Sequence, residues 1–292
     1  MKKCSFLLLL ISNYCISQVI TGHNIPVLQP VINKPQHDPP VVVNIYTEVL
    51  AFDICTNNIT VANDSGYFVG DTVLLIQMKG AIIDTSNTAS FGTILDYRNA
   101  GNYEFNYISQ KIGNVLTFKN KLTKTYDIPD GVVQLVRVPT FITGNFGGGL
   151  TCDLWNGTKG GILAIFSMIS LECDEDIDVS GKGFRGGVGY NAVTSSLSCN
   201  QNNYIYPVTS QFAGFKGESI ASFSQNYVKG KGSFGGGGGG GNSHNAGGGG
   251  GGNGVQEELV GIKLIPAAPH LLITGVWVEE IFNIPLMQIK YF

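Results

Sequence analysis

The chain has 292 residues, and 40 of them are glycine. Charged residues make up 13% of the chain, against about 25% in a typical globular domain. The net charge is −3, and the absence of a basic stripe with interleaved aromatic residues excludes a nucleic-acid-binding protein. Beyond the N-terminus no apolar run approaches the roughly 20 residues that span a membrane, so we expect no membrane span.

The first 17 residues have the layout of a secretory signal peptide. Lys2 and Lys3 precede a short apolar run, and a polar stretch ends at Ser17, after which a signal peptidase would cut. Cleavage there leaves 16 basic against 21 acidic residues, a net charge of −5. We therefore predict a secreted protein at the outer cell surface. Residues 18–40 hold five prolines among polar residues and are expected to form an extended leader.

Residues 41–140 show a period-two, β-branched pattern that predicts a compact β-domain. The expected strands are separated by turns rich in glycine, asparagine and aspartate. Their ranges are 41–46, 72–78, 93–96, 103–107, 115–118 and 132–138. Such a series of short strands is typical of a small β-barrel or sandwich. Its core is expected to include Val73, Leu75, Val115, Val133 and Leu135.

Residues 141–254 change in character and are predicted to form a glycine-rich, solenoid-like region. Short apolar segments at 160–166, 169–171 and 177–181 are typical of successive edges of a parallel β-solenoid. Within 230–254, glycine occupies 16 of 25 positions. Two outcomes stay open for this tract. It is either a flexible loop, since glycine loses the most entropy on ordering, or a set of packed polyproline-II strands whose backbones approach closely.

Residues 255–292 differ abruptly from what precedes them. Glycine falls to 2 of 38 positions, and the run from Leu271 to Val278 is apolar. This tail is either a genuine closing strand or helix, or the product of a reading-frame slip within the glycine tract. In the shifted frame a glycine codon is forced at Trp277-Val278, because the single tryptophan codon ends in G. We favour the slip, which predicts that the tail packs poorly and that the true protein continues past residue 292.

Four cysteines remain after cleavage of the signal peptide: Cys55, Cys152, Cys173 and Cys199. An even number in an exported chain is compatible with two disulfides, for which three pairings exist. We favour Cys173–Cys199 as the more local pair.

Acidic side chains gather just before a glycine-rich turn. Asp174, Asp176 and Asp178 alternate along the chain and could bind calcium through carboxylate oxygens. A solvated acidic edge is the other interpretation. No further cofactor is expected, because the GxGxxG match at 181–186 is not followed by the helix that a dinucleotide site requires.

The sequence favours binding over catalysis. Residues 41–229 contain no histidine that could activate a serine nucleophile. A glycan hydrolase remains an alternative and would need two converging carboxylates. A carbohydrate-binding module is a second alternative and would use aromatic side chains along one sheet face. Its candidates are Tyr97, Tyr103, Phe105 and Tyr107, although alternate positions on one strand face also suit a core.

Several stretches together resemble a known group of surface proteins. They are GDTVLLIQMKGA at 70–81, GNYE at 101–104, VQLVRVP at 133–139, WNG with GG at 155–161, and DVSGKGFRGG at 178–187. This series resembles the N-terminal region of large glycine-rich surface proteins of gliding Gram-negative bacteria that use type IX secretion. The resemblance implies an extracellular protein, usually extended by repeat modules and a C-terminal sorting domain. The tract 235–252 is also similar to the glycine-rich domain of the anaplastic lymphoma kinase receptor, which packs polyproline-II strands.

These features lead to one prediction for the whole chain. It is expected to be all-β, with a barrel or sandwich at 41–140 followed by a solenoid-like or polyproline-II region at 141–254. Its predicted function is that of a secreted cell-surface adhesin or envelope structural protein without catalytic activity. Its expected partners are extracellular polysaccharide or other surface proteins.

Overall fold

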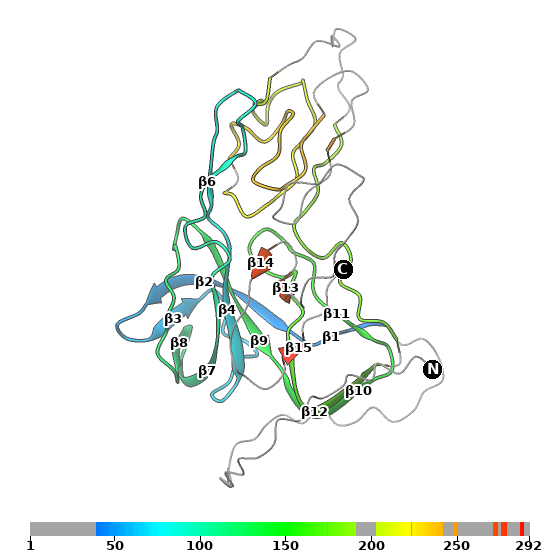
Figure 1. The fold of residues 1–292 in the computed structure, drawn as a ribbon. Helices are drawn as coiled ribbons and strands as arrows, with labels where there is room; N and C mark the ends of the chain where they lie inside the picture. The colour runs from blue at the N-terminus through cyan, green and yellow to red at the C-terminus, as the bar shows by residue number, and fades with distance from the viewer. Residues whose placement is uncertain are drawn as a thin grey trace, which may run out of the picture.

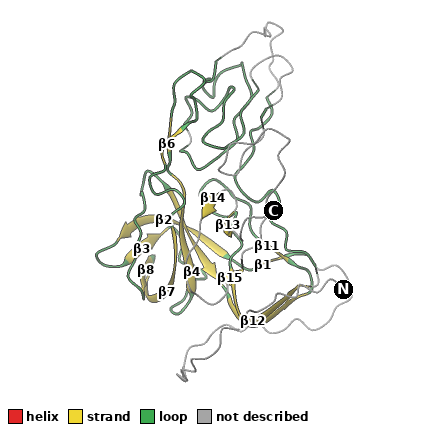
Figure 2. Ribbon diagram, viewed as in Figure 1, coloured by secondary structure: helices red, strands yellow, loops and turns green. Residues whose placement is uncertain are grey.

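The computed structural model describes residues 39–173, 175–190, 203–222, 224–241 and 248–249, together with three short strands after residue 270. Every regular element in this part of the chain is a β-strand (Figure 2). The predicted all-β class is therefore confirmed. The same residues include no helix with the length and apolar character needed to cross a membrane.

Six strands close into a barrel, seen at the lower left of Figure 1. Their order around the ring is β2-β3-β8-β7-β4-β9, and each neighbouring pair is antiparallel. The strands are β2 (Ile45–Asp53), β3 (Asn58–Val61), β4 (Thr72–Lys79), β7 (Tyr103–Ile112), β8 (Val115–Phe118) and β9 (Val132–Val138). Closure of the ring places the start of β2 beside β9, which positions the site described below.

Strands β4 and β9 are buried on both faces, so successive residues belong to two different cores. Val73 and Leu75 lie in the barrel core, whereas Leu74 and Ile76 lie in an outer core. The barrel core comprises Val49, Ile59, Val61, Tyr67, Val73, Leu75, Ile108, Leu116, Phe118, Leu122, Tyr126, Val133 and Leu135. The outer core comprises Tyr46, Leu74, Ile76, Met78, Val136, Val138, Cys152, Trp155, Ile162, Ala164 and Val179. Residues on both sides of position 140 therefore share one hydrophobic core.

One residue of the predicted core was assigned to the wrong face. Val115 is 37% exposed, whereas Leu116 is fully buried. In the β3–β8 ladder Leu116 lies opposite Ile59 of the barrel core, and successive side chains of a strand point to opposite faces. The side of β8 that faces the barrel core is therefore the opposite of the predicted one.

Parallel pairing begins where the barrel ends. β1 (Val41–Val42) pairs with β11 (Leu150–Thr151), and β10 (Thr140–Phe146) pairs with β12 (Ile165–Cys173). Leu150 also forms a parallel bridge with Ile177. The strand predicted at 160–166 is wrong over its first five residues, because β12 begins at Ile165. A solenoid-like arrangement of 141–254 stays a prediction.

Two buried side-chain amides take the place of a strand neighbour along 160–164. The Nδ2 of Asn44 donates to the carbonyl of Ala164 at 2.6 Å, and the Ala164 amide donates to Oδ1 of Asn44 at 3.0 Å. Gln134 makes the same pair of bonds with Gly160, at 3.1 and 2.8 Å. These bonds satisfy backbone groups that would be costly to bury alone. They fix the path of the segment against the barrel.

A hairpin from the barrel carries the glycine-rich region. It contains β5 (Ile82–Ile83) and β6 (Ile94–Asp96) and extends towards the top of Figure 1. Phe91, between these strands, packs edge-on against Tyr227 and beside Phe234, with ring centroids 6.0 and 5.9 Å away. A small third core therefore joins the hairpin to residues 204–234.

Backbone lies directly against backbone in the described glycine segment 235–241. The amide of Gly214 donates to Gly241 at 2.6 Å, and that of Gly217 donates to Gly238 at 2.7 Å. A Cβ atom added at Gly237 would lie 2.6 Å from the carbonyl oxygen of Gly217. Only glycine permits this approach. The polyproline-II assignment stays a prediction, and residues 242–247 lie outside the described part.

A buried ion cluster, the Glu218 cluster, connects this region to β4. The Glu218 carboxylate accepts from Lys79 at 3.0 Å, from Arg185 at 2.7 Å and from the indole of Trp155 at 3.0 Å. The Glu218 side chain is 8% exposed and that of Lys79 5%. Burial acts to raise the pKa of Glu218, but the bonds and charges of Arg185 and Lys79 outweigh it and lower the pKa to about 2.

A second buried lysine organises the glycine-rich region from within. Lys216 is 2% exposed, and its Nζ lies 4.1 Å from the centroid of the Phe91 ring. The Nζ also donates to backbone carbonyls at distances of 2.6 to 2.9 Å. These carbonyls belong to Tyr204, Gly230, Lys231 and Gly232. Lys216 therefore connects the segment at Tyr204 with the segment 230–232 through their backbones.

Three short strands are described in the atypical tail. They are β13 (Leu271–Ile273), β14 (Val276–Val278) and β15 (Met287–Gln288). β13 pairs with β14, and β15 pairs with β12, in both cases antiparallel. The reading-frame slip stays a prediction, as do the signal peptide and leader, whose residues 1–38 lie outside the described part.

Candidate functional site: a polar pocket beside the barrel

The acidic positions predicted to bind calcium are only partly described. Asp176 and Asp178 are exposed, and Asp174 lies outside the described residues. Asp178 accepts the amide of Ser180 at 2.8 Å, and hydrogen bonding to Ser180 lowers the pKa of Asp178. Across the described part of the chain, no group of three or more His, Cys, Asp or Glu residues could hold a metal ion. Calcium binding stays a prediction.

The structure describes the side chains of two of the four cysteines predicted to form disulfides. Cys55 is exposed and Cys152 is buried, and both are free thiols. The pairing that joins them is therefore not formed in the structure. Burial raises the pKa of Cys152 to about 11, so its thiol stays protonated and unreactive. Cys199 and the side chain of Cys173 lie outside the described residues, and their pairing stays a prediction.

The four aromatic residues suggested for glycan stacking do not form one flat platform. Tyr103 and Phe105 meet edge to face, with centroids 6.2 Å apart, and pack against the outer core. Burial raises the pKa of Tyr103. Tyr107 is 46% exposed on β7, and Tyr97 is 56% exposed just after β6. The half-buried pair serves packing, which leaves Tyr107 and Tyr97 as separate exposed rings.

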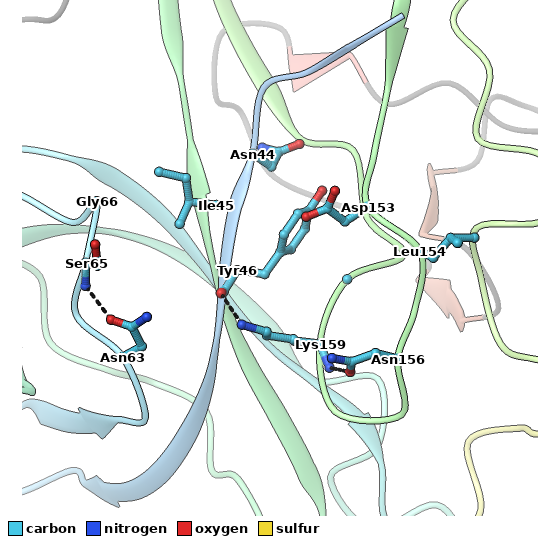
Figure 3. A pocket seen from close by; sticks show the side chains of 11 residues that line it. Asn44, Ile45, Tyr46, Asn63, Ser65, Gly66, Asp153, Leu154, Asn156 and Lys159 are labelled. Atoms are coloured by element: carbon cyan, nitrogen blue, oxygen red, sulfur yellow. Dashed lines mark hydrogen bonds between the residues drawn. The ribbon is translucent and has the colours of Figure 1, made fainter.

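A different place on the molecule has the features of a binding site. A pocket of about 420 Å³ lies between the start of β2, the turn 63–66 and the loop 153–160 (Figure 3). Small-ligand sites have volumes of roughly 300–1,000 Å³. Its polar lining residues are Asn44, Asn63, Ser65, Asp153, Asn156 and Lys159. Tyr46 also lines the pocket, and its hydroxyl donates to the Ile162 carbonyl at 2.5 Å.

The loop 153–160 is held rigidly. The Oδ1 of Asn156 accepts the amides of Thr158 at 2.9 Å and Lys159 at 3.0 Å. The Asn156 amide donates to the Lys159 carbonyl at 3.1 Å. Gly157 has a φ of +112°, a conformation that L side chains rarely adopt. Together with the Gln134 bonds to Gly160 these contacts preorganise the loop.

The turn on the other side of the pocket is fixed in a similar way. The Oδ1 of Asn63 accepts the Ser65 amide at 2.9 Å, and the Asn63 amide donates to Oγ1 of Thr47 on β2 at 3.0 Å. Both walls therefore offer side chains from short, hydrogen-bonded turns. Such preorganisation reduces the entropy lost when a ligand binds.

Several polar groups of the pocket have no partner among the described residues. They are the Asp153 carboxylate, the Ser65 hydroxyl and the Nδ2 groups of Asn63 and Asn156. Lys159 makes one bond, from Nζ to the Tyr46 carbonyl at 3.3 Å. A concave surface with free donors and acceptors can bind a polyhydroxylated ligand directly.

No pattern in the amino-acid sequence indicates this pocket directly. Its lining includes Asn63, Ser65 and Asn156, residue types that are common in ordinary turns. About 90 residues separate the two turns, and only long-range strand pairing brings them together. Gly66 follows Ser65 and Gly157 follows Asn156, a pattern that indicates tight turns and not a binding site.

Comparison with known proteins gives no family for this chain. No protein-family model and no curated protein sequence matches it. Among solved structures, it is similar to the Gp54 tailspike of Acinetobacter baumannii bacteriophage AP22, which was solved in complex with A. baumannii capsular saccharide. The similarity has a TM-score of 0.23 and 14% identity, over 37% of this chain. The chain spans 21% of the tailspike's length, and this likeness assigns neither fold nor function.

Proposed function

We propose that this chain is a secreted, non-catalytic adhesin of the cell surface that binds extracellular polysaccharide through the pocket at β2. The observation that carries the proposal is the set of unpartnered polar groups on two rigid turns. Sugars present closely spaced hydroxyls, each a donor and an acceptor, and amide, carboxylate and hydroxyl side chains match them. The resemblance to glycine-rich surface proteins of type IX-secreting bacteria is in keeping with this role.

The composition of the pocket favours binding over hydrolysis. Among its described lining residues, Asp153 is the sole carboxylate. Hydrolysis of a glycosidic bond ordinarily uses two carboxyl groups that flank it. We therefore place the glycan hydrolase behind the adhesin as an interpretation of this site.

The proposal predicts that a small change at Asp153 weakens glycan binding. Asp153→Asn keeps the size of the side chain and removes the charged acceptor, and hydrogen bonds to charged groups contribute about 1.5–3 kcal/mol. We expect binding to weaken roughly 10-fold or more, since 1.4 kcal/mol corresponds to a factor of ten. A glycan array followed by calorimetry on the best ligand measures it.

Asp130→Asn is the matched control, because Asp130 is 76% exposed and lies outside the pocket. It should bind like the wild type. If the full chain binds no polysaccharide on the array, or if both variants bind equally well, the pocket is not a glycan site and the proposal fails.

A further inference from the structure

The free groups of the pocket are mainly hydrogen-bond donors. The Oδ1 atoms of Asn63 and Asn156 already accept backbone amides, so the groups left to a ligand are their NH₂ ends. Lys159 adds an ammonium with three hydrogens, one of which is directed to the Tyr46 carbonyl. Against these donors stands one free acceptor that carries charge, the Asp153 carboxylate.

The Lys159 ammonium is placed by the fold. Its backbone closes the turn with Asn156, and the next residue, Gly160, is bonded twice to the buried Gln134. Figure 3 shows Lys159 reaching from the loop towards the β2 segment at Tyr46. The described part of the chain offers this lysine no ion pair. The pocket also contains the Asp153 carboxylate, but no ion pair joins it to Lys159, so the ammonium keeps its charge available for an anionic ligand.

We propose that the pocket recognises an acidic sugar, a hexuronate unit within a polysaccharide, whose carboxylate binds Lys159. This inference rests on the proposed function and specifies its ligand. The side-chain NH₂ groups of Asn156 and Asn63 donate further hydrogen bonds to the oxygen atoms of the uronate. Asp153 accepts a ring hydroxyl, and its negative charge disfavours a second carboxylate in the same pocket.

The test compares an oligogalacturonate with the same oligosaccharide after reduction of its carboxyl groups, using the full chain and calorimetry. The wild type should bind the acidic form at least 10-fold more tightly. Raising the salt concentration should weaken binding of the acidic form alone, since salt screens the attraction between the uronate carboxylate and the Lys159 ammonium. Lys159→Met should lose the preference for the acidic form, whereas Lys121→Met, at an exposed lysine outside the pocket, should keep it.

The outcomes separate this inference from the proposed function. Equal binding of the acidic and reduced forms by the wild type overturns the uronate assignment and leaves a neutral-glycan adhesin. Binding of neither form, with no ligand on a broad array, removes both proposals. The wild-type comparison stands even if Lys159→Met is unstable, and Lys159→Gln gives a second test of the charge.

Discussion

Glu218→Gln is expected to cost about 3–5 kcal/mol of stability, the usual penalty for removing one partner of a buried ion pair. The substitution leaves the buried ammonium of Lys79 without a counter-charge, next to the guanidinium of Arg185, whose side chain is exposed. Because the Glu218 cluster connects β4 to the glycine-rich region, the loss should be greatest there. Denaturant unfolding gives the total, and hydrogen exchange of residues 214–241 gives its location.

Asp130→Asn provides the comparison for this prediction. Asp130 forms an ion pair with Arg98 at 3.6 Å and is 76% exposed, and such surface pairs contribute about 0–1 kcal/mol. A loss at Glu218 no larger than the loss at Asp130 would show that the cluster does not hold the two parts together.

The same cluster predicts sensitivity to acid. The pKa of Glu218 is lowered from 4.5 to about 2 in the folded protein, so its contribution to stability is complete above the unfolded pKa. That contribution disappears as the pH falls from 4.5 towards 2. Thermal melting over this interval should show a steeper decline for the wild type than for Glu218→Gln. Parallel declines would contradict the assignment.

Lys216→Met is expected to unfold the glycine-rich region while leaving the barrel largely intact. The change removes a donor from four backbone carbonyls, of which that of Gly230 also accepts the Gly240 amide at 2.9 Å. A buried acceptor left without a partner costs about 1–3 kcal/mol. Apart from the small third core, the glycine segment 235–241 has no side chains that could compensate. Limited proteolysis should then cut within 204–241 at protease concentrations that leave the wild type uncut.

Lys231→Met is the control, because it shows whether loss of any lysine in this region lowers protease resistance as much as loss of Lys216. Its Nζ lies over the Tyr204 ring at 4.5 Å, a contact that contributes about 0.5–1 kcal/mol at a partly exposed site. If Lys216→Met resists protease as well as Lys231→Met does, the hydrogen bonds from Lys216 to the four carbonyls are not what keeps the glycine-rich region folded.

The sequence predicted the fold class because the strand periodicity is local. The expected strand at 132–138 matches β9, and that at 72–78 matches β4 to within one residue. The error at β8 has a clear cause. Val-Leu-Thr-Phe carries an apolar residue in both alternating sets, and ladder partners distant in sequence decide which set turns inward.

The site was harder to predict than the strands. Its two walls come together because β2 closes the barrel against β9 and because Asn44 and Gln134 hold the segment 160–164. Side-chain amides that act as a strand partner leave no periodic pattern. The apolar run at 160–166 therefore has the pattern of a strand, and the polar turns beside it have the pattern of simple connections.

The close approach of glycine backbones has a consequence for how this gene can change. At positions such as Gly237, where a Cβ would lie 2.6 Å from another carbonyl oxygen, even alanine is excluded. Every base change at the first or second position of a glycine codon introduces a side chain or a stop, so these codons can vary only silently. In the barrel, by contrast, one apolar residue often replaces another at a cost below about 1.5 kcal/mol. The two parts of the chain should therefore diverge at very different rates, with the tract of lowest complexity the more slowly changing of the two.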